Sequence, residues 1–276
     1  MKRFILAIIL VLAFGADSLA LNLRPYMQTP PEVQVFAKRV LDDGGKVIDL
    51  EYAQKLTRLA KQLDTWSNVK FLADANLAYK SGVTTTVAKL YDLSGNNSDA
   101  VQGTVVNQPV WTANLQNGKA GVVFTAASPH TLLHNLSFGA NSTFVALASR
   151  NGGSGYKSII SCTLDPIMAT TVTSANWGTY QNVEISTSYS IDGSFKLMIN
   201  VLRAVNDIDL VTNGTVENKV TGSSWINSGK SLGSGQPAFQ YFLNGTIIEV
   251  IMFNIALTTV QRTAIERMIN SYYSIY

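Results

Sequence analysis

From about residue 70 onward, the chain consists of short runs of β-branched and aromatic residues separated by Gly, Asn, Ser and Pro. This punctuation is typical of many short strands joined by turns. The runs that predict strands are Val69–Tyr79, Val83–Tyr91, Ala120–Phe124, Ser142–Ser149, Lys157–Cys162, Thr179–Ser188, Lys196–Ala204, Ala238–Phe242 and Ile247–Phe253. So many strands at this spacing predict a mainly β protein in which two antiparallel sheets pack as a sandwich.

The low charge of the chain restricts what it can bind. Charged residues make up 14% of the chain and hydrophobic residues 46%, and the formal net charge is only +3. Intrinsic disorder is excluded, because disordered chains are rich in charge and poor in aliphatic residues. Nucleic acid is not an expected partner, since it normally requires a strongly basic patch. A single cysteine and two histidines favour a chain with no metal and no cofactor.

Residues 1–24 predict a segment that engages a membrane. Lys2 and Arg3 precede an apolar run whose anchoring side chains are Phe4, Ile5, Leu6, Ile8, Ile9, Leu10, Val11, Leu12 and Phe14. The sequence Ser18-Leu19-Ala20 fits cleavage by signal peptidase. Residues 4–23 also suffice for one crossing of a bilayer, at about 20 residues per crossing. A cleaved signal peptide and a retained transmembrane helix therefore both remain open.

Residues 25–69 predict a short helical stem. Pro31 and Glu32 suit the first turn of a helix, and the run Asp42-Asp43-Gly44-Gly45 ends it. Asp49 is placed to cap a second amphipathic helix. Two helices this short bury too little surface alone, so we expect them to pack on the β domain or on a copy of themselves.

The β domain, predicted over residues 70–276, closes with a helix. Thr258 suits its N-cap, and Gln261 three residues later completes a capping box. The residues expected on the buried stripe of this helix are Ala264, Ile265, Met268, Ile269 and Tyr272.

Three stretches in this order, Leu90–Gln102, Gln116–Phe124 and Asn244–Asn254, resemble the concanavalin A-like, laminin G-like jelly rolls of many secreted bacterial and bacteriophage proteins. The resemblance covers roughly Lys70 to Tyr276 and implies an antiparallel jelly-roll sandwich. The stem followed by Trp66–Tyr79 resembles the arrangement in bacteriophage virion proteins that carry such a domain. Fold alone does not fix function, because this fold is used by lectins, glycanases and structural modules.

The resemblance implies a non-enzymatic structural or adhesion protein of a bacteriophage virion. Its N-terminus would be anchored in a membrane or capsid through residues 4–23, and its jelly roll would point outward for assembly or contact with a host-surface glycan. Other virion or cell-envelope proteins, and a second copy of the chain, are the partners that this implies. The alternative is a secreted or membrane-tethered bacterial carbohydrate-binding protein of the cell envelope.

The acidic residues favour no catalytic site. A glycanase needs two carboxyl groups between about 5 and 10 Å apart. Glu184 and Glu249 each lack a second acidic residue two positions away on the same strand. Asp207-Ile-Asp209 has that spacing, but Asn213-Gly214 follows it, and the pattern is read as a solvated, turn-flanked edge. No catalytic residue is therefore predicted.

Metal sites are not expected either. His130 and His134 have a ligand spacing only on a helix, whereas Pro129 and two leucines favour a strand or loop. Family members with a calcium site place acidic residues near the loop that follows the Gly121–Phe124 strand. Here that loop, Thr125–His130, contains no carboxylate, and calcium prefers six to eight oxygen ligands.

Aromatic side chains are the remaining candidates for ligand binding, because an exposed ring offers a sugar an apolar platform. Trp177 and Tyr180 are the best candidates for exposed rings, since polar residues and glycine surround them. Trp66, Trp111 and Trp225 are alternatives, and burial in a core is the competing role for each of these rings.

Overall fold

The computed structural model describes residues 28–139, 141–151, 155, 157–162, 166–170, 176–180, 184–204, 207–220, 227–234 and 241–276. The predicted apolar segment, residues 1–24, lies outside them. Among the described residues, no helix combines the length and the apolarity that a membrane crossing requires.

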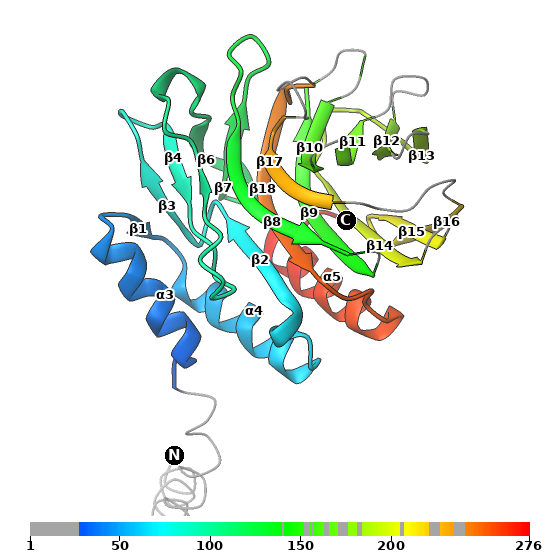
Figure 1. Cartoon of the computed structure of the whole chain (residues 1–276), viewed down its shortest axis with the longest axis horizontal. Coiled ribbons are helices and arrows are strands. Elements are labelled where there is room, and N and C mark those ends of the chain that lie inside the picture. Colours follow the sequence, from blue (N-terminus) through cyan, green and yellow to red (C-terminus); the bar gives the residue numbers. More distant parts are fainter. Residues whose placement is uncertain are drawn as a thin grey trace, which may run out of the picture.

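The described part of the chain is mainly β, with antiparallel sheets and a C-terminal helix, as predicted (Figure 1). One sheet has the strand order β1 (Lys46–Val47), β3 (Ala78–Ser81), β4 (Val87–Leu90), β5 (Ala100–Val101), β8 (Leu132–Phe138), β17 (Asn227–Leu232), β10 (Lys157–Cys162), β11 (Pro166–Thr170), β12 (Asn176–Tyr180) and β13 (Glu184–Ser190). We call it the ten-stranded sheet. The other, eight-stranded sheet has the order β16 (Thr215–Lys219), β15 (Asp207–Thr212), β14 (Lys196–Ala204), β9 (Ser142–Arg150), β18 (Gly245–Phe253), β7 (Lys119–Phe124) and β6 (Val110–Gln116), with β2 (Val69–Asp74) paired to β18.

Strand β18 is the centre of the eight-stranded sheet. It pairs with β9 along its whole length, while its other edge is shared by β7 and then β2. Every residue of β18 is buried. Its two faces contribute to two different cores, because side chains alternate across a strand. Val250 and Met252 lie in the core between the sheets, and Ile251 and Phe253 lie in a second core under the helices.

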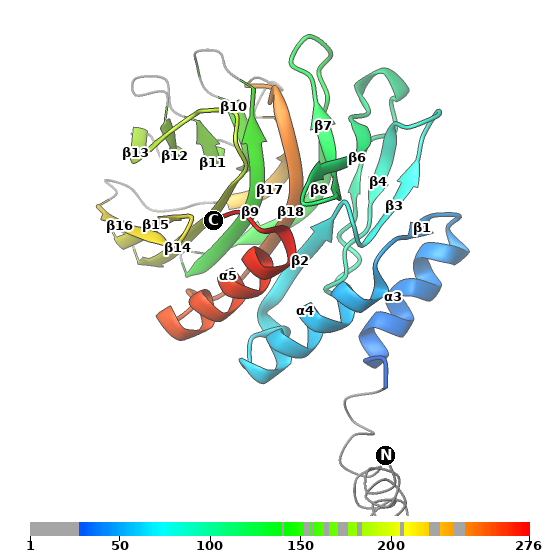
Figure 2. The same ribbon diagram turned by 180° about the vertical axis from the view of Figure 1, so that it is seen from behind.

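The helices α4 (Leu50–Gln62) and α5 (Thr259–Tyr273) lie on the outer face of the eight-stranded sheet, and α3 (Pro31–Asp42) lies beside α4 and against β1 and β3 (Figures 1 and 2). Their apolar faces share one core with β9, β14 and β18. The predicted helix signals are confirmed: Pro31 stands in the first turn of α3, the Asp49 carboxylate accepts the Tyr52 N–H at 2.9 Å, and Thr258 with Gln261 forms the capping box. On α5, however, Tyr273 rather than Tyr272 is fully buried.

Several strand predictions are corrected by turns that short-range patterns do not reveal. The run Val69–Tyr79 is not one strand, because a turn after Asp74 sends β2 and β3 into different sheets. Asp207–Asp209 belongs to β15 and is a solvated edge only at Asp207, which is exposed. Asp209 is only 4% exposed, with hydrogen bonds from Arg203 and Asn218. In the predicted run Ala238–Phe242, the described residues 241 and 242 are not in a strand.

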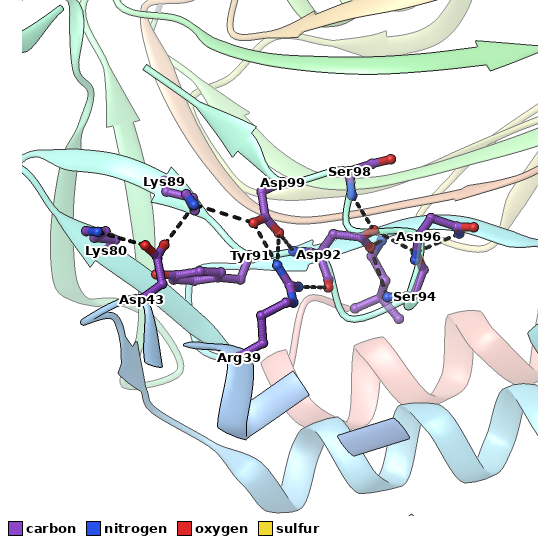
Figure 3. A network of polar contacts seen from close by, with 11 residues as sticks. Arg39, Asp43, Lys80, Lys89, Tyr91, Asp92, Ser94, Asn96, Ser98 and Asp99 are labelled. Atoms are coloured by element: carbon purple, nitrogen blue, oxygen red, sulfur yellow. Dashed lines mark hydrogen bonds and ion pairs between the residues drawn. The ribbon is translucent and has the colours of Figure 1, made fainter. Parts of the chain in front are cut away.

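The motif Leu90–Gln102 folds into a polar loop that holds α3 (Figure 3). Asp92 accepts hydrogen bonds from the N–H groups of Leu72, Ser94 and Ser98, and thereby shapes the loop. Arg39 of α3 donates to both oxygens of Asp99, at 2.8 and 2.7 Å, and to the Asp92 carbonyl at 2.6 Å. The motif that underlies the family resemblance therefore has a structural role here.

We expect Arg39→Ala to destabilise the protein by about 1–3 kcal/mol, because the largely buried Asp99 would lose a charged donor. The matched control is Lys38→Ala, whose partner Asp42 is exposed, as is Lys38 itself, so that little change is expected. Urea unfolding monitored by circular dichroism measures both. Equal stability of the two variants would contradict the conclusion that Arg39 fixes α3 to the loop that contains Asp92 and Asp99.

Candidate functional site

Two buried carboxyl groups meet under the helices. Asp74 of β2 and Glu249 of β18 are direct partners across the two strands. A bulge between Ile247 and Glu249 turns Glu249 to the helix face, where Asp74 also points. Both residues are 0% exposed. This acid pair was missed in the sequence, because its members lie far apart in the chain and only strand pairing joins them.

The two carboxyl groups accept different numbers of hydrogen bonds. Asp74 accepts from the Asn76 backbone N–H at 2.5 Å, from the Asn76 amide at 3.1 Å and from the Tyr273 hydroxyl. Glu249 accepts only from the Tyr52 hydroxyl, at 2.9 Å, and its Oε1 has no hydrogen-bond partner among the described residues. Asp74 is therefore the better placed of the two to carry negative charge.

Burial raises the pKa of Asp74 to about 7. Burial also raises the pKa of Glu249 well above its usual range, and the charge of Asp74 adds to the effect. Glu249 therefore holds its proton more tightly than an exposed glutamate does. The pair has the composition that acid–base catalysis uses, but α4 and α5 cover it, so a polysaccharide has no access to it.

A second candidate is a cavity of about 360 Å³ at the outer face of the ten-stranded sheet, which we call the outer pocket. It forms where the end of β5, the short turn Val105–Asn107 and the start of β8 meet Phe242. Leu133 points into solvent there, whereas its neighbour Leu132 lies in the core between the sheets. The lining residues are Gln102, Thr104, Asn107, Pro129, Thr131, Leu133 and Phe242.

The polar wall of the outer pocket is held in place by hydrogen bonds. The Gln102 amide donates to the Thr131 carbonyl at 3.1 Å, and its oxygen accepts the Thr104 N–H at 2.9 Å. The Thr131 N–H donates to the Asn107 carbonyl at 3.2 Å. The Asn107 side-chain amide makes no hydrogen bond within the described part of the chain. The pocket thus combines apolar surface with two amides. Hydrogen bonds fix the Gln102 amide, and the Asn107 amide is available to a ligand.

A further cavity, of about 370 Å³, lies between the start of α3 and the end of α4. Its cations already have partners: Arg58 donates to the Gln28 carbonyl at 2.9 Å, and Lys61 pairs with Glu32 at 2.6 Å. This cavity is therefore a weaker candidate than the outer pocket.

The singled-out aromatic residues whose side chains the structure describes do not form an exposed sugar platform, and half-buried Trp66 packs against the core under the helices. Trp177 is 1% exposed, so the expectation of an exposed ring there is wrong. Its ring fills the core between the sheets. Trp111 stacks on Tyr79 at 5.1 Å between ring centroids and donates to the Ala75 carbonyl. The side chains of Tyr180 and Trp225 lie outside the described residues.

The histidines are placed as the sequence suggested. His134 lies on β8, and the His130 ring accepts the Thr125 N–H at 3.1 Å, so these residues do not share a helix. Among the described residues, no group of three or more potential ligands gathers as a metal site would require.

Neither a protein-family model nor a curated protein matches the sequence. Solved structures match in fold. The chain is similar to a Trypanosoma rangeli sialidase in complex with 2,3-difluorosialic acid, with a TM-score of 0.51 and 10% identity over 81% of this chain and 39% of the sialidase chain. It is also similar to the binding domain of Paraclostridial Mosquitocidal Protein 1, with a TM-score of 0.50 and 14% identity over 75% of this chain and 53% of that one.

The chain therefore spans between about two fifths and about half of these two structures. At such low identities the likeness concerns the fold alone, a β-sandwich. The membership of a concanavalin A-like or bacteriophage family stays a prediction from the sequence motifs.

The acid pair predicts how stability depends on pH. The native state keeps protons on both carboxyl groups that the unfolded chain releases near about pH 4. The contribution of Asp74 is full below about pH 4 and is lost as pH rises through about 7, and that of Glu249, whose pKa is raised well above its usual range, is lost at higher pH. The loss is about 1.4 kcal/mol per pH unit for each proton. Glu249→Gln cannot ionise, so it should flatten the decline between pH 5 and 8.

Urea unfolding at a series of pH values measures this dependence. Glu51→Gln, the same substitution at an exposed position of α4, is the matched control and should leave the dependence unchanged. A decline equally steep in Glu249→Gln and in the wild type would show that the acid pair does not hold these protons.

Proposed function

We propose that this chain is a non-enzymatic adhesion module that contacts a glycan through the outer pocket. The observation that carries the proposal is the lining of the pocket, in which amides and hydroxyls alternate with Pro129, Leu133 and Phe242. Sugars present hydroxyl groups around an apolar ring face, and such a lining matches both. Its volume of about 360 Å³ falls in the usual range of small-molecule sites, roughly 300–1,000 Å³.

The absence of enzymatic activity is part of the proposal. Two carboxyl groups must flank the bond that a glycosidase cleaves. Within the described part of the chain, the lining of the outer pocket includes no carboxylate. Asp74 and Glu249, the paired carboxyl groups, are buried under the helices. The similarity to a sialidase supports only the fold, so it does not weigh against this part of the proposal.

The setting of the module is proposed from the sequence resemblance: a bacteriophage virion, with residues 4–23 in a membrane or capsid and with other virion proteins or a second copy as neighbours. The second candidate is a secreted or membrane-tethered bacterial carbohydrate-binding protein. Both use the same pocket. Removal of residues 1–20 would indicate the secreted form of the second candidate, whereas a retained segment fits the virion protein and the membrane-tethered form. The intact mass of native protein separates a cleaved signal peptide from a retained anchor.

A glycan array probed with the full-length protein in mild detergent tests the binding function. We expect Asn107→Ala and Phe242→Ala each to weaken binding about tenfold, since each removes about 1.4 kcal/mol of polar or apolar contact. Asn135→Ala is the matched control, because Asn135 is exposed on the same strand as Leu133 but outside the pocket. Unchanged binding in both pocket variants, or no binding by the wild type, would refute the proposal.

The same samples test the absence of catalysis. Glycans bound on the array are incubated with the wild type and assayed for released reducing ends. No release is expected. Release that Glu249→Gln abolishes would show that the acid pair is catalytic.

A further inference from the structure

A chain of four buried hydroxyl groups ends at the outer pocket. Thr131 lines the pocket, and its hydroxyl lies 2.7 Å from that of Ser234. The Ser234 hydroxyl lies 3.2 Å from that of Ser231, which in turn lies 2.7 Å from that of Ser161. Thr131 is 4% exposed and the three serines are 0% exposed. Bulk water therefore does not reach these groups, and their protons are shared among the hydroxyl groups and the nearby carbonyl groups.

Counting protons fixes the direction of the chain, because each hydroxyl has one proton to donate. Ser231 donates its proton to the Ser234 carbonyl at 2.8 Å, and a carbonyl can only accept. The Ser231 oxygen therefore accepts from both Ser234 and Ser161. Since the Ser234 proton is used there, Thr131 is the donor in the contact with Ser234. The Leu232 carbonyl, 3.3 Å away, is a second acceptor for the same Thr131 proton.

The consequence is that the Thr131 hydroxyl turns its proton into the protein and can offer a ligand only acceptor lone pairs. A sugar hydroxyl can donate to such an oxygen while accepting from the Asn107 amide. A carboxylate, sulfate or phosphate group has only acceptor oxygens at neutral pH, so it would meet the Thr131 oxygen without a proton between them.

The lack of positive charge in the described lining of the pocket also disfavours acidic ligands. Among the residues that the structure describes, the lining includes no lysine, arginine or histidine that could pair with an anion. An anionic group placed in the pocket would lose its hydration without gaining an ion pair, which is costly. A neutral sugar ring has no such cost.

We infer that the outer pocket selects uncharged sugars and rejects acidic ones, and that Ser234 and Ser231 act as positioning residues by fixing the Thr131 hydroxyl as an acceptor. This inference rests on the proposed glycan-binding function and names the ligand class of the same pocket.

The test compares neutral glycans with acidic counterparts: lactose with sialyllactose, which adds one acidic sugar, and fully methyl-esterified with unesterified oligosaccharides of galacturonic acid, which differ only in their carboxylates. Affinities for the full-length protein are measured by isothermal titration calorimetry at neutral pH. For every pair in which binding is detected, we expect the neutral member to bind at least about tenfold tighter. An acidic member that binds as tightly as its neutral counterpart, or more tightly, would overturn the inference and leave the proposed function standing. If no member of either pair binds and the glycan array is also negative, the proposed function fails with it.

Variants test the role of the hydroxyl chain. Thr131→Val removes the acceptor and should lower neutral affinity about tenfold, whereas Thr131→Ser keeps the hydroxyl and should retain the preference. Ser234→Ala removes the nearer acceptor and leaves the Thr131 proton only the Leu232 carbonyl at 3.3 Å, so that it turns toward the ligand more often, and the ratio of neutral to acidic affinity should fall severalfold. Ser158→Ala is the matched control, because Ser158 is equally buried on the same strand as Ser161 but outside the chain.

Thermal unfolding confirms that each variant is folded before its affinity ratio is read. An affinity ratio unchanged in both Thr131→Val and Ser234→Ala would overturn the inferred role of the chain. So would a ratio that falls equally in Ser158→Ala, because that result would mean a general effect of losing a buried hydroxyl.

Discussion

The structure depends on strand β18, which is buried on both faces and paired on both edges. Its pairing with β9, which runs along the whole strand and contains one bulge, sets the register of the eight-stranded sheet. Strands β2 and β7 share the opposite edge. One face of β18 supplies the core between the sheets, and the other supplies the core under the helices. The helices and the ten-stranded sheet are therefore held on opposite sides of the same strand.

This arrangement decides which faces of the two sheets a ligand can reach. The helices cover the outer face of the eight-stranded sheet, so the acid pair on that face is enclosed, and burial raises the pKa of Glu249. The ten-stranded sheet keeps exposed positions on its outer face, such as Leu133 beside the outer pocket. Backbone and side-chain hydrogen bonds fix the pocket wall. The wall therefore loses little conformational entropy when a ligand binds.

Local signals in the sequence predicted local structure well. Asp49 and Thr258 mark helix starts because a cap acts over only two or three residues. The acid pair could not be predicted, because the partnership of Asp74 with Glu249 depends on strand pairing and a bulge. The exposure of Trp177 was predicted wrongly, since polar neighbours in the sequence do not reveal which face of a strand is covered. The outer pocket escaped prediction because three separate segments build it.

The most direct test of a glycan site at the outer pocket is hydrogen–deuterium exchange of the full-length protein, with and without the neutral glycan that binds most tightly on the array. Slower exchange is predicted in residues 102–107 and 129–133, which form the pocket wall, with no change in α4 and α5. Protection confined to α4, α5 or the turn after Asp74 would contradict this placement and would point to the helix-covered face instead.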